Sequence, residues 1–548
     1  MANKVLIFGG GVAGLTAAHE LVDRGFQVEV HEAGIVVGGK ARSIDKPNSG
    51  QAGRQDLPGE HGFRFFPGFY QHVIDTMMAI PATAQATVAH NLTDTQQVGI
   101  ARIGKPLILL DVLAPTTPQE WLEALETWFA NPELGVPFEE AAFFVGKLLQ
   151  FMTSCDDRRL GEYEGKKWWD YVEATGKSKG YQDLLARGLT RSLVAMRAET
   201  ASTRTIATIL CQMLFSMADP TGPACDRVLN APTNTAWINP WHQMLLARGV
   251  QFVMGSALDG FTLQNGQIQS AHVRSTAGLQ SVSADHYVCA IPKEAMERVT
   301  TASPQLAQAA PSLMHLGDLK TDWMTGIQFF LKLDVPILPG HVILSESPWA
   351  LTLLSQSQFW PGVNLTHFGN GNVAGIFSVD ISDWDTASAR APRAKDCTEI
   401  QIRDEVWAQL KEHLAFANLQ DSNRIDHFLD PAIVFANPTE NREQLFINTI
   451  GSWHLRPEAR TNVPNLFLAS DYVQTHTDLA TMEGANEAAR RAVNALLLAA
   501  GSTAQPCAVW PLKEPSAFDA AKQFDQLLWD MNVPHPGAVT ILNLTGWI

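Results

Sequence analysis

A glycine-rich turn after the first apolar stretch restricts the fold of this chain more than any other feature. Residues 5–8 form a short apolar run, as in a buried parallel strand, and Gly9, Gly11 and Gly14 follow in the spacing Gly-x-Gly-x-x-Gly. Gly9 allows the turn, Gly11 lets the backbone approach a pyrophosphate, and Gly14 lets the next helix lie close to the strand. The turn therefore predicts the start of a βαβ unit.

A second strand follows the predicted helix and ends in an acid. Residues 26–31 alternate apolar with other side chains before Glu32. About 20 residues after the glycine turn, a carboxylate can accept hydrogen bonds from the ribose of an adenine dinucleotide. The alternative is a glycine turn without a ligand, but strand, turn, helix, strand and acid in register favour a Rossmann-like unit that binds a dinucleotide.

A second glycine motif distinguishes between the dinucleotides. Gly38 and Gly39 are followed by Lys40 and Arg42, a pattern that a nicotinamide-binding domain has no reason to carry. It resembles the Gly-Gly-Arg/Lys-x-x-Ser motif of flavoproteins of the phytoene desaturase and amine oxidase superfamily, whose loop passes along the pyrophosphate toward the flavin. The resemblance implies FAD as the cofactor.

Residues 59–72 carry a second resemblance. They are similar to the Gly-Leu-His-x-Phe-Phe-Gly-x-Tyr-x-Asn stretch of plant-type phytoene and ζ-carotene desaturases, and hydroxysqualene dehydroxylase-like flavoproteins are a second near neighbour. Arg64 stands where that motif has histidine, Pro67 is inserted, and His72 replaces asparagine. The resemblance implies that the glycines let the backbone pass the flavin while the phenylalanines enclose a dry pocket. Each phenylalanine taken alone is better explained as part of the core.

The second anchor lies near the other end of the chain. Residues 465–471 form an apolar run that ends in Asp471, and residues 481–485 open a helix. The pair is similar to the family's Leu-Phe-x-Ala-Gly-Asp and Met-Glu-Gly-Ala motifs, with Ser470 in place of glycine. There the aspartate contacts the phosphate and ribityl end of FAD, and amides at the helix start stabilise negative charge on a reduced flavin. The alternative for Asp471 is a helix-capping acid.

These motifs define the candidate site residues. The cofactor-binding candidates are Gly9, Gly11, Val12, Ala13, Gly14, Glu32, Gly39, Lys40, Arg42, Gly62, Phe63, Asp471, Thr481, Met482 and Ala485. The catalytic candidates are Arg64, His61, Tyr70 and His72, with Trp453 and His454 ranked lower. Arginine keeps its proton at neutral pH, so Arg64 is expected to act as an electrostatic partner. The acid–base role then falls to one of the other candidates, or to the substrate or water.

The expected activity follows from the cofactor and from a missing motif. Residues 369–375 contain glycines in the wrong spacing for a second dinucleotide fingerprint, so a built-in NADPH domain is not indicated. We expect an FAD-dependent oxidoreductase that desaturates a largely apolar small molecule, with room for a polar group, by hydride transfer to flavin N5, and that passes its electrons to oxygen or a quinone. Three alternatives stay open: an amine oxidase that forms an imine and hydrogen peroxide, a flavin-dependent isomerase or dehydroxylase, and a non-enzymatic prenyl-binding module.

The resemblance implies an α/β fold, α+β overall, with a Rossmann-like FAD-binding domain interleaved with a substrate domain of mixed sheet and helical cap. The expected segments are residues 1–75, 236–300 and 446–505 for the FAD-binding domain, 76–235 for the helical cap, 301–445 for the substrate sheet, and 506–548 for a tail packed on the body. Helices are expected from residue 117, where Thr117 and Glu120 form a capping box, and over residues 138–152, 180–197, 202–217, 398–415 and 516–531. Strands are expected over residues 249–253, 260–273, 284–292, 325–333 and 374–379, with a turn at Asn265 and Gly266 inside the second of these ranges.

Composition excludes several classes of function. A net charge of −16 argues against nucleic acid and anionic membrane surfaces as partners. No run approaches the ~18 apolar residues of a membrane span, although peripheral membrane contact stays open. The first strand follows the start so closely that we expect no signal peptide and a cytoplasmic protein. The 6 cysteines and 16 histidines lack metal-ligand spacing, so no metal is expected.

Overall fold

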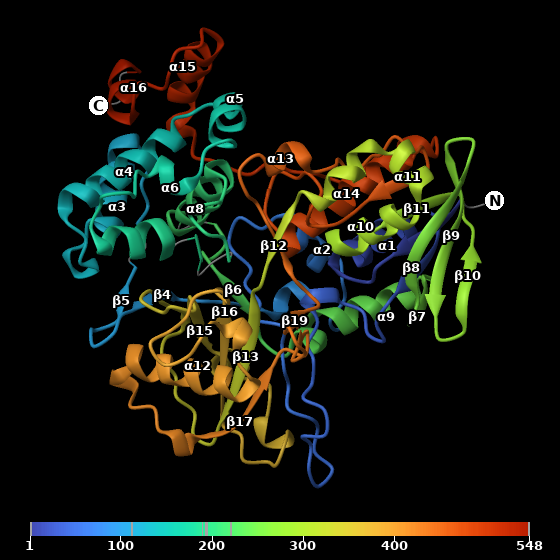
Figure 1. The fold of residues 1–548 in the computed structure, drawn as a ribbon, viewed down its shortest axis with the longest axis horizontal. Coiled ribbons are helices and arrows are strands. Elements are labelled where there is room, and N and C mark those ends of the chain that lie inside the picture. The colour runs from blue at the N-terminus through green and yellow to red at the C-terminus, as the bar shows by residue number, and fades with distance from the viewer. Residues whose placement is uncertain (1–2, 111–112, 189, 192–194, 220–221, 546–548) are drawn as a thin grey trace.

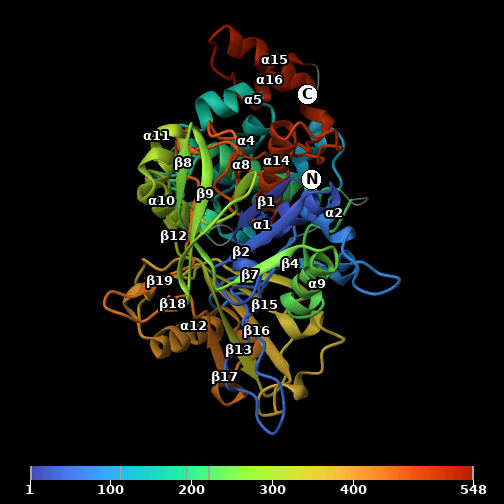
Figure 2. The same cartoon turned by 90° about the vertical axis from the view of Figure 1, so that its right-hand side faces the viewer.

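The protein is described by a computed structural model that covers residues 3–110, 113–188, 190–191, 195–219 and 222–545. A dinucleotide-binding lobe, a lobe built on a large sheet and a helical layer make up the chain (Figure 1). Both views place the C-terminal helices and the large sheet at opposite ends of the molecule (Figures 1 and 2). No helix in these ranges is long and apolar enough to cross a membrane.

A parallel sheet of five strands carries the glycine turn. Its order is β21 (Leu466–Leu468), β11 (His286–Cys289), β1 (Lys4–Phe8), β2 (Gln27–Glu32) and β7 (Gln251–Met254), and every neighbouring pair is parallel. The predicted βαβ unit and the predicted strands within residues 249–253 and 284–292 are thereby confirmed. Since its strands come from distant parts of the chain, this lobe is assembled from separate segments, as expected.

An antiparallel sheet borders this lobe (Figure 2). It consists of β8 (Ala257–Gln264), β9 (Gln267–Ser275) and β10 (Gly278–Val282). Asn265 and Gly266 connect β8 to β9 with φ of 53° and 76°. Two positive φ values match the right-handed twist of a hairpin and explain the Asn-Gly pair, so the predicted turn is confirmed.

The large sheet has one apolar face and one face of mixed character. Its order is β17 (Arg424–Leu429), β13 (Thr325–Leu331), β16 (Gly375–Ile381), β15 (Leu351–Ser355), β14 (Gly340–Leu344), β4 (Gln97–Ala101) and β5 (Ile108–Leu109). Helix α12 (Glu399–His413) covers the apolar face. There Trp407 packs against Phe329 and Phe377 with ring centroids 5.2 and 6.4 Å apart. Because side chains alternate along a strand, the other face is free to form a site.

The helical layer begins as its capping box predicts. Thr117 accepts a hydrogen bond from the backbone N–H of Glu120 at the start of α3 (Pro118–Phe129), and the glutamate side chain accepts one in return. The predicted helices over residues 138–152 and 202–217 are α4 (Phe138–Met152) and α8 (Thr203–Met217). Unexpectedly, the segment assigned to the cap also supplies β4 and β5 to the large sheet.

The helix predicted over residues 180–197 is too long. A π-helix covers Tyr181–Gly188, and residues 189 and 192–194 lie outside the described part of the chain. Ala195 has a φ of 52°, in the left-handed region where an α-helix cannot continue. The first part of the predicted helix is confirmed, since residues 181–188 and 190–191 are helical, and the prediction is wrong only for residues 195–197.

The C-terminal tail contacts the helical layer through buried polar groups. Its main helix is α15 (Asp519–Asp530), in which the buried Asp525 accepts two hydrogen bonds from Nε of Arg158 at 2.9 and 3.0 Å. Nη2 of Arg158 also donates to the carbonyl of Val533 at 2.8 Å, and its guanidinium lies 5.2 Å from the ring of Trp529. Buried charge-assisted contacts of this kind fasten the tail to the helical layer.

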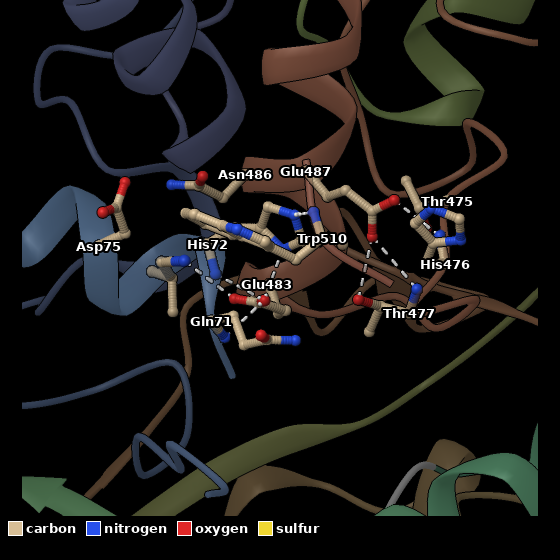
Figure 3. A network of polar contacts seen from close by, with 12 residues as sticks. Gln71, His72, Asp75, Thr475, His476, Thr477, Glu483, Asn486, Glu487 and Trp510 are labelled. Carbon is tan, nitrogen blue, oxygen red and sulfur yellow. Dashed lines mark hydrogen bonds and ion pairs between the residues drawn. The ribbon is translucent and has the colours of Figure 1, made fainter. Parts of the chain in front are cut away.

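Two buried carboxylates, one turn apart on α14 (Met482–Ala499), join segments around the dinucleotide lobe (Figure 3). Glu483 accepts hydrogen bonds from the backbone N–H groups of residues 71–73, at 2.8, 2.8 and 2.9 Å, and from Nδ1 of His72 at 2.7 Å. Glu487 accepts from the backbone N–H groups of His476 and Thr477 at 2.7 and 3.2 Å. Helix α14 thereby holds the end of the 59–72 segment and the loop that leads to its own start.

Replacement of Glu483 by alanine should destabilise the fold strongly. The change leaves three backbone N–H groups, two buried and one half-buried, without an acceptor, and the free energy of unfolding should fall by about 3 kcal/mol or more. Urea unfolding of parent and variant measures the difference. Glu123→Ala, which removes an exposed helical carboxylate, is the control and should change stability by less than about 0.5 kcal/mol. Equal stability of both variants would contradict this role.

Candidate active site

Two of the three glycines in the turn are required by the protein itself. A Cβ atom at Gly9, whose φ is 101°, would lie 2.3 Å from the carbonyl oxygen of Ala290, and one at Gly14 would lie 1.8 Å from that of Gly9. At Gly11, by contrast, a Cβ would meet only the Cα and N of Gly39, at 3.6 and 3.9 Å. The protein therefore leaves room at Gly11 that it does not use for its own packing.

The start of α1 (Val12–Asp23) is suited to an anion. Gly11 is its N-cap, and no side chain in the described part of the chain caps it. The first N–H groups of a helix lack intrahelical partners, and the helix dipole favours negative charge there. The backbone of Val12 and Ala13 thus faces the place where the sequence predicts a pyrophosphate.

Glu32 lies beside this turn at the end of β2. Its Oε2 accepts from the N–H of Gly10 at 2.6 Å and its Oε1 from the N–H of Gly34 at 2.6 Å. The carboxylate is therefore held in place by backbone donors, and each oxygen keeps a further acceptor site for a ribose hydroxyl.

The basic residues after the second glycine pair bind protein groups. Nη2 of Arg42 forms an ion pair with Oε1 of Glu443 at 2.7 Å, and Nη1 donates to the carbonyl of Gly39 at 2.6 Å. Nζ of Lys40 donates to the carbonyl of Gln444. Both cations tie this loop to the segment before β20 (Leu445–Ile447), so their part in cofactor binding stays a prediction.

The start of α14 supplies the second anchor. Oγ1 of Thr481, the N-cap, accepts from the N–H of Gly484 at 3.1 Å and also bonds to the hydroxyl of Tyr70. Burial raises the pKa of Tyr70 above its ordinary range, so its hydroxyl stays protonated and acts as a donor. Asp471 ends the segment after β21, where its Oδ1 accepts from Oγ of Ser470 at 3.2 Å. Met482 and Ala485 are partly exposed in the first turn.

A cavity of about 180 Å³ lies between the mixed face of the large sheet, the 59–72 segment and the helical layer. Most of its lining is apolar; examples are Ile100, Trp128, Leu184, Leu210, Met217 and Ile343. Phe63 and Phe65 form the wall contributed by the 59–72 segment. Of the predicted catalytic residues, none belongs to this lining among the described side chains.

Asp380 on β16 is a buried acid in this wall. Burial raises the pKa of its carboxyl to about 7, against the opposing effect of Arg64, His61 and His341. The N–H of Phe63 donates to it, while its Oδ1 has no hydrogen-bond partner among the described residues. A Cβ at Gly62 would lie 2.6 Å from this oxygen, so Gly62 is required by contact with the sheet, and its cofactor role stays a prediction.

A histidine and a second acid face each other across the cavity wall. Nδ1 of His341, on β14, contacts Oδ2 of Asp226, and both side chains are buried. The imidazole lies between two aromatic rings, with centroids 4.6 Å from Phe63 and 5.5 Å from Phe65. Sequence motifs did not point to either residue. The sequence held one signal for His341: it is the single ionisable side chain in the apolar run of residues 340–344. Burying such a side chain costs free energy, so its presence indicates a function.

The predicted catalytic residues have other partners. Nδ1 of His61 contacts Oδ2 of the buried Asp430. Nη2 of Arg64 donates to the carbonyl of Lys40 at 3.0 Å and lies 3.8 Å from Oε2 of Glu60. Arg64 thus supports the loop after the second glycine pair, and its role toward the flavin stays a prediction.

His72 has a structural role in this geometry. Its Nδ1 bonds to Glu483 at 2.7 Å, and its Nε2 accepts from the backbone N–H of Trp510 at 3.0 Å (Figure 3). Since both ring nitrogens are occupied inside the protein, the imidazole is not placed to exchange a proton with a substrate. We do not carry His72 forward as a catalytic residue.

Comparison with known proteins gives the family. The model of NAD(P)-binding Rossmann-like domains matches residues 7–79, and that of flavin-containing amine oxidoreductases matches residues 242–497. The resemblance to the phytoene desaturase and amine oxidase superfamily that the sequence motifs predict is thereby confirmed. It is 23% identical over 535 residues to a ζ-carotene desaturase of Synechocystis sp., covering 90% of this chain and 97% of the relative. It is 25% identical over 539 residues to a probable ζ-carotene desaturase of Synechococcus elongatus, covering 90% and 98%.

Solved structures of this superfamily share the fold. Cyclohexylamine oxidase from Brevibacterium oxydans superimposes with a TM-score of 0.59 at 14% identity, covering 91% of this chain and 99% of that one. The match to flavin-containing amine oxidoreductases and the two desaturase relatives confirm the prediction of an FAD-dependent oxidoreductase. The room at Gly11, the uncapped start of α1 and the donors at the start of α14 fit this dinucleotide.

Gly11→Val should abolish FAD binding without unfolding the protein. Gly11 has φ of −74°, which valine adopts readily, and its Cβ direction is free of close protein contacts, so the branched side chain occupies space left for the pyrophosphate. The measurement is flavin absorbance per chain after gel filtration. Gly146→Val, at a helical glycine whose Cβ would meet no atom within 4 Å, is the control and should stay yellow. Full FAD retention by Gly11→Val would remove Gly11 from the cofactor site.

Asp380→Asn should change how stability depends on pH. The folded-state pKa near 7 lies above the ordinary 3.8, so the folded parent binds more protons than the unfolded chain between these values, and its stability falls as pH rises through the window. The variant lacks this loss. Its free energy of unfolding, minus that of the parent at equal FAD loading, should therefore increase from about pH 5 to about pH 7.5. A constant difference across this range would show that Asp380 does not titrate there.

Proposed function

We propose that the protein is an FAD-dependent desaturase that oxidises a carbon–carbon bond of a long, largely apolar substrate. The observation that carries the proposal is the apolar cavity between the 59–72 segment and the large sheet. Burying an apolar chain against an apolar wall is favourable, whereas a strongly hydrated ligand would lose water there without gaining hydrogen bonds. Bound FAD supplies the chemistry by accepting a hydride from a substrate carbon.

The protein's part in this reaction is to bind and orient the substrate and the cofactor and to exclude water from them. Phe63, Phe65 and the helical layer exclude water from the reacting carbon. Glu32 and the starts of α1 and α14 hold the two ends of the cofactor. The ζ-carotene desaturases that the chain resembles act on a hydrocarbon polyene, which is the chemical class that we propose for this cavity.

Amine oxidation is the second candidate, because Asp226 and Asp380 in the cavity wall are acids that could hold an ammonium group. Two observations weigh against it. The pKa of Asp380 near 7 leaves this carboxyl partly neutral at neutral pH, and Asp226 already contacts His341.

Oxygen or a quinone as electron acceptor and a cytoplasmic location complete the proposal.

The test is anaerobic reduction of the bound flavin. Mixing with ζ-carotene should bleach the flavin absorbance and yield a polyene with a longer conjugated system, which absorbs at longer wavelength. The Gly11→Val protein, without FAD, should convert nothing. Bleaching by cyclohexylamine with peroxide release in air, and none by ζ-carotene, would favour the amine oxidase. Conversion of ζ-carotene without any flavin reduction would favour an isomerase.

A further inference from the structure

Desaturation removes a proton as well as a hydride, and the proton needs an acceptor. When the first carbon gives up hydride, its neighbour must lose H⁺ for the double bond to form. Water is a poor acceptor in a cavity with apolar walls, because little of it is present there. The acceptor is therefore expected on the cavity wall itself.

The predicted bases do not meet this requirement. His61 does not line the cavity, His72 uses both ring nitrogens, and burial keeps the hydroxyl of Tyr70 protonated by raising its pKa. Asp380 lines the cavity, but its raised pKa leaves it partly protonated at neutral pH.

His341 meets it. Its side chain lines the cavity, Nδ1 contacts the Asp226 carboxylate, and Nε2 is buried without a hydrogen-bond partner among the described residues. Asp226 is itself held by Oγ1 of Thr95, which donates to its Oδ2 at 3.3 Å. A carboxylate on one ring nitrogen fixes the tautomer in which the other nitrogen is a free acceptor, and it stabilises the imidazolium that forms.

We propose that Nε2 of His341 accepts the proton released during desaturation and that Asp226 is the positioning residue that orients this imidazole. The inference rests on the proposed function. One C–H bond breaks with its electron pair, which leaves as hydride to FAD. The C–H bond on the adjacent carbon breaks with its proton going to Nε2, and the pair left behind becomes the second bond of C=C. The imidazolium passes the proton to solvent after product leaves.

The test compares FAD-loaded His341→Gln and Asp226→Asn with the parent. Flavin reduction by ζ-carotene should be at least ~100-fold slower in His341→Gln, the usual contribution of a general base, and about 10-fold slower or more in Asp226→Asn. FAD content and ζ-carotene binding, read from quenching of tryptophan fluorescence, should match the parent. Added imidazole should partly restore the rate in His341→Ala, which a packing role of the ring would not allow.

The matched control is His413→Gln. His413 is also buried, but it lies on α12, across the opposite face of the same sheet, where its Nδ1 bonds to the carbonyl of Gln409 at 2.8 Å. Its loss should leave the rate of flavin reduction unchanged. Parent-like reduction by His341→Gln overturns the proposal.

A second measurement does not depend on turnover. The ring signal of His341 in the NMR spectrum, assigned by its loss in His341→Gln, should move when the apolar probe n-decane is added to the FAD-loaded protein. An unmoved signal overturns the proposal whatever the kinetics show. A moved signal in a parent that ζ-carotene does not reduce rejects the proposed substrate class and supports the place of His341 in the substrate cavity.

Discussion

The close packing of β1, α1 and the end of β11 at the glycine turn is the constraint on which the predicted cofactor site depends. A Cβ would need to lie 1.8 Å from a carbonyl oxygen at Gly14 and 2.3 Å from one at Gly9, so only glycine lets these backbones approach. That approach aligns the start of α1 with the carboxyl edge of the sheet, where the end of β2 places Glu32. The cofactor site is thus a consequence of backbone packing, and at Gly11 the packing leaves space for a ligand.

The two faces of the large sheet have different roles, because successive side chains along a strand point to opposite faces. Every second residue of β13, β14, β15 and β16 belongs to the apolar cluster under α12, and of the alternate residues His341, Ile343, Thr352 and Asp380 line the cavity. Ile343, Thr352 and Asp380 share one row across three strands, by the register of β14 with β15 and of β15 with β16. A shift of one residue in that register would bury Asp380 under α12 and remove it from the site.

Buried charges connect the lobes. Glu483 and Glu487, neighbours on one helix, hold two loops by their backbone donors, and Asp525 fastens the tail through Arg158. A buried charge destabilises the fold when it has no partner. When it accepts hydrogen bonds from several donors, it favours the one arrangement of the chain that brings those donors together. His72 belongs to this framework, which is why its departure from the family's asparagine is explained by packing against Trp510.

The sequence alone predicted the dinucleotide lobe, its cofactor and most helices and strands, because these depend on local spacing: glycines at a turn, a capping box at Thr117, Asn-Gly at a hairpin. It could not predict which ionisable groups meet at the cavity. His341, Asp226 and Asp380 lie on different strands and loops, and only strand order and register bring them to one wall. The catalytic candidates drawn from residues 59–72 were near in sequence to the flavin motif, yet folding gave His61 and His72 buried partners of their own. Motifs that are local in the sequence were enough to predict the cofactor site. The candidate proton acceptor could be found only from tertiary contacts, because strand order and register place it at the cavity wall.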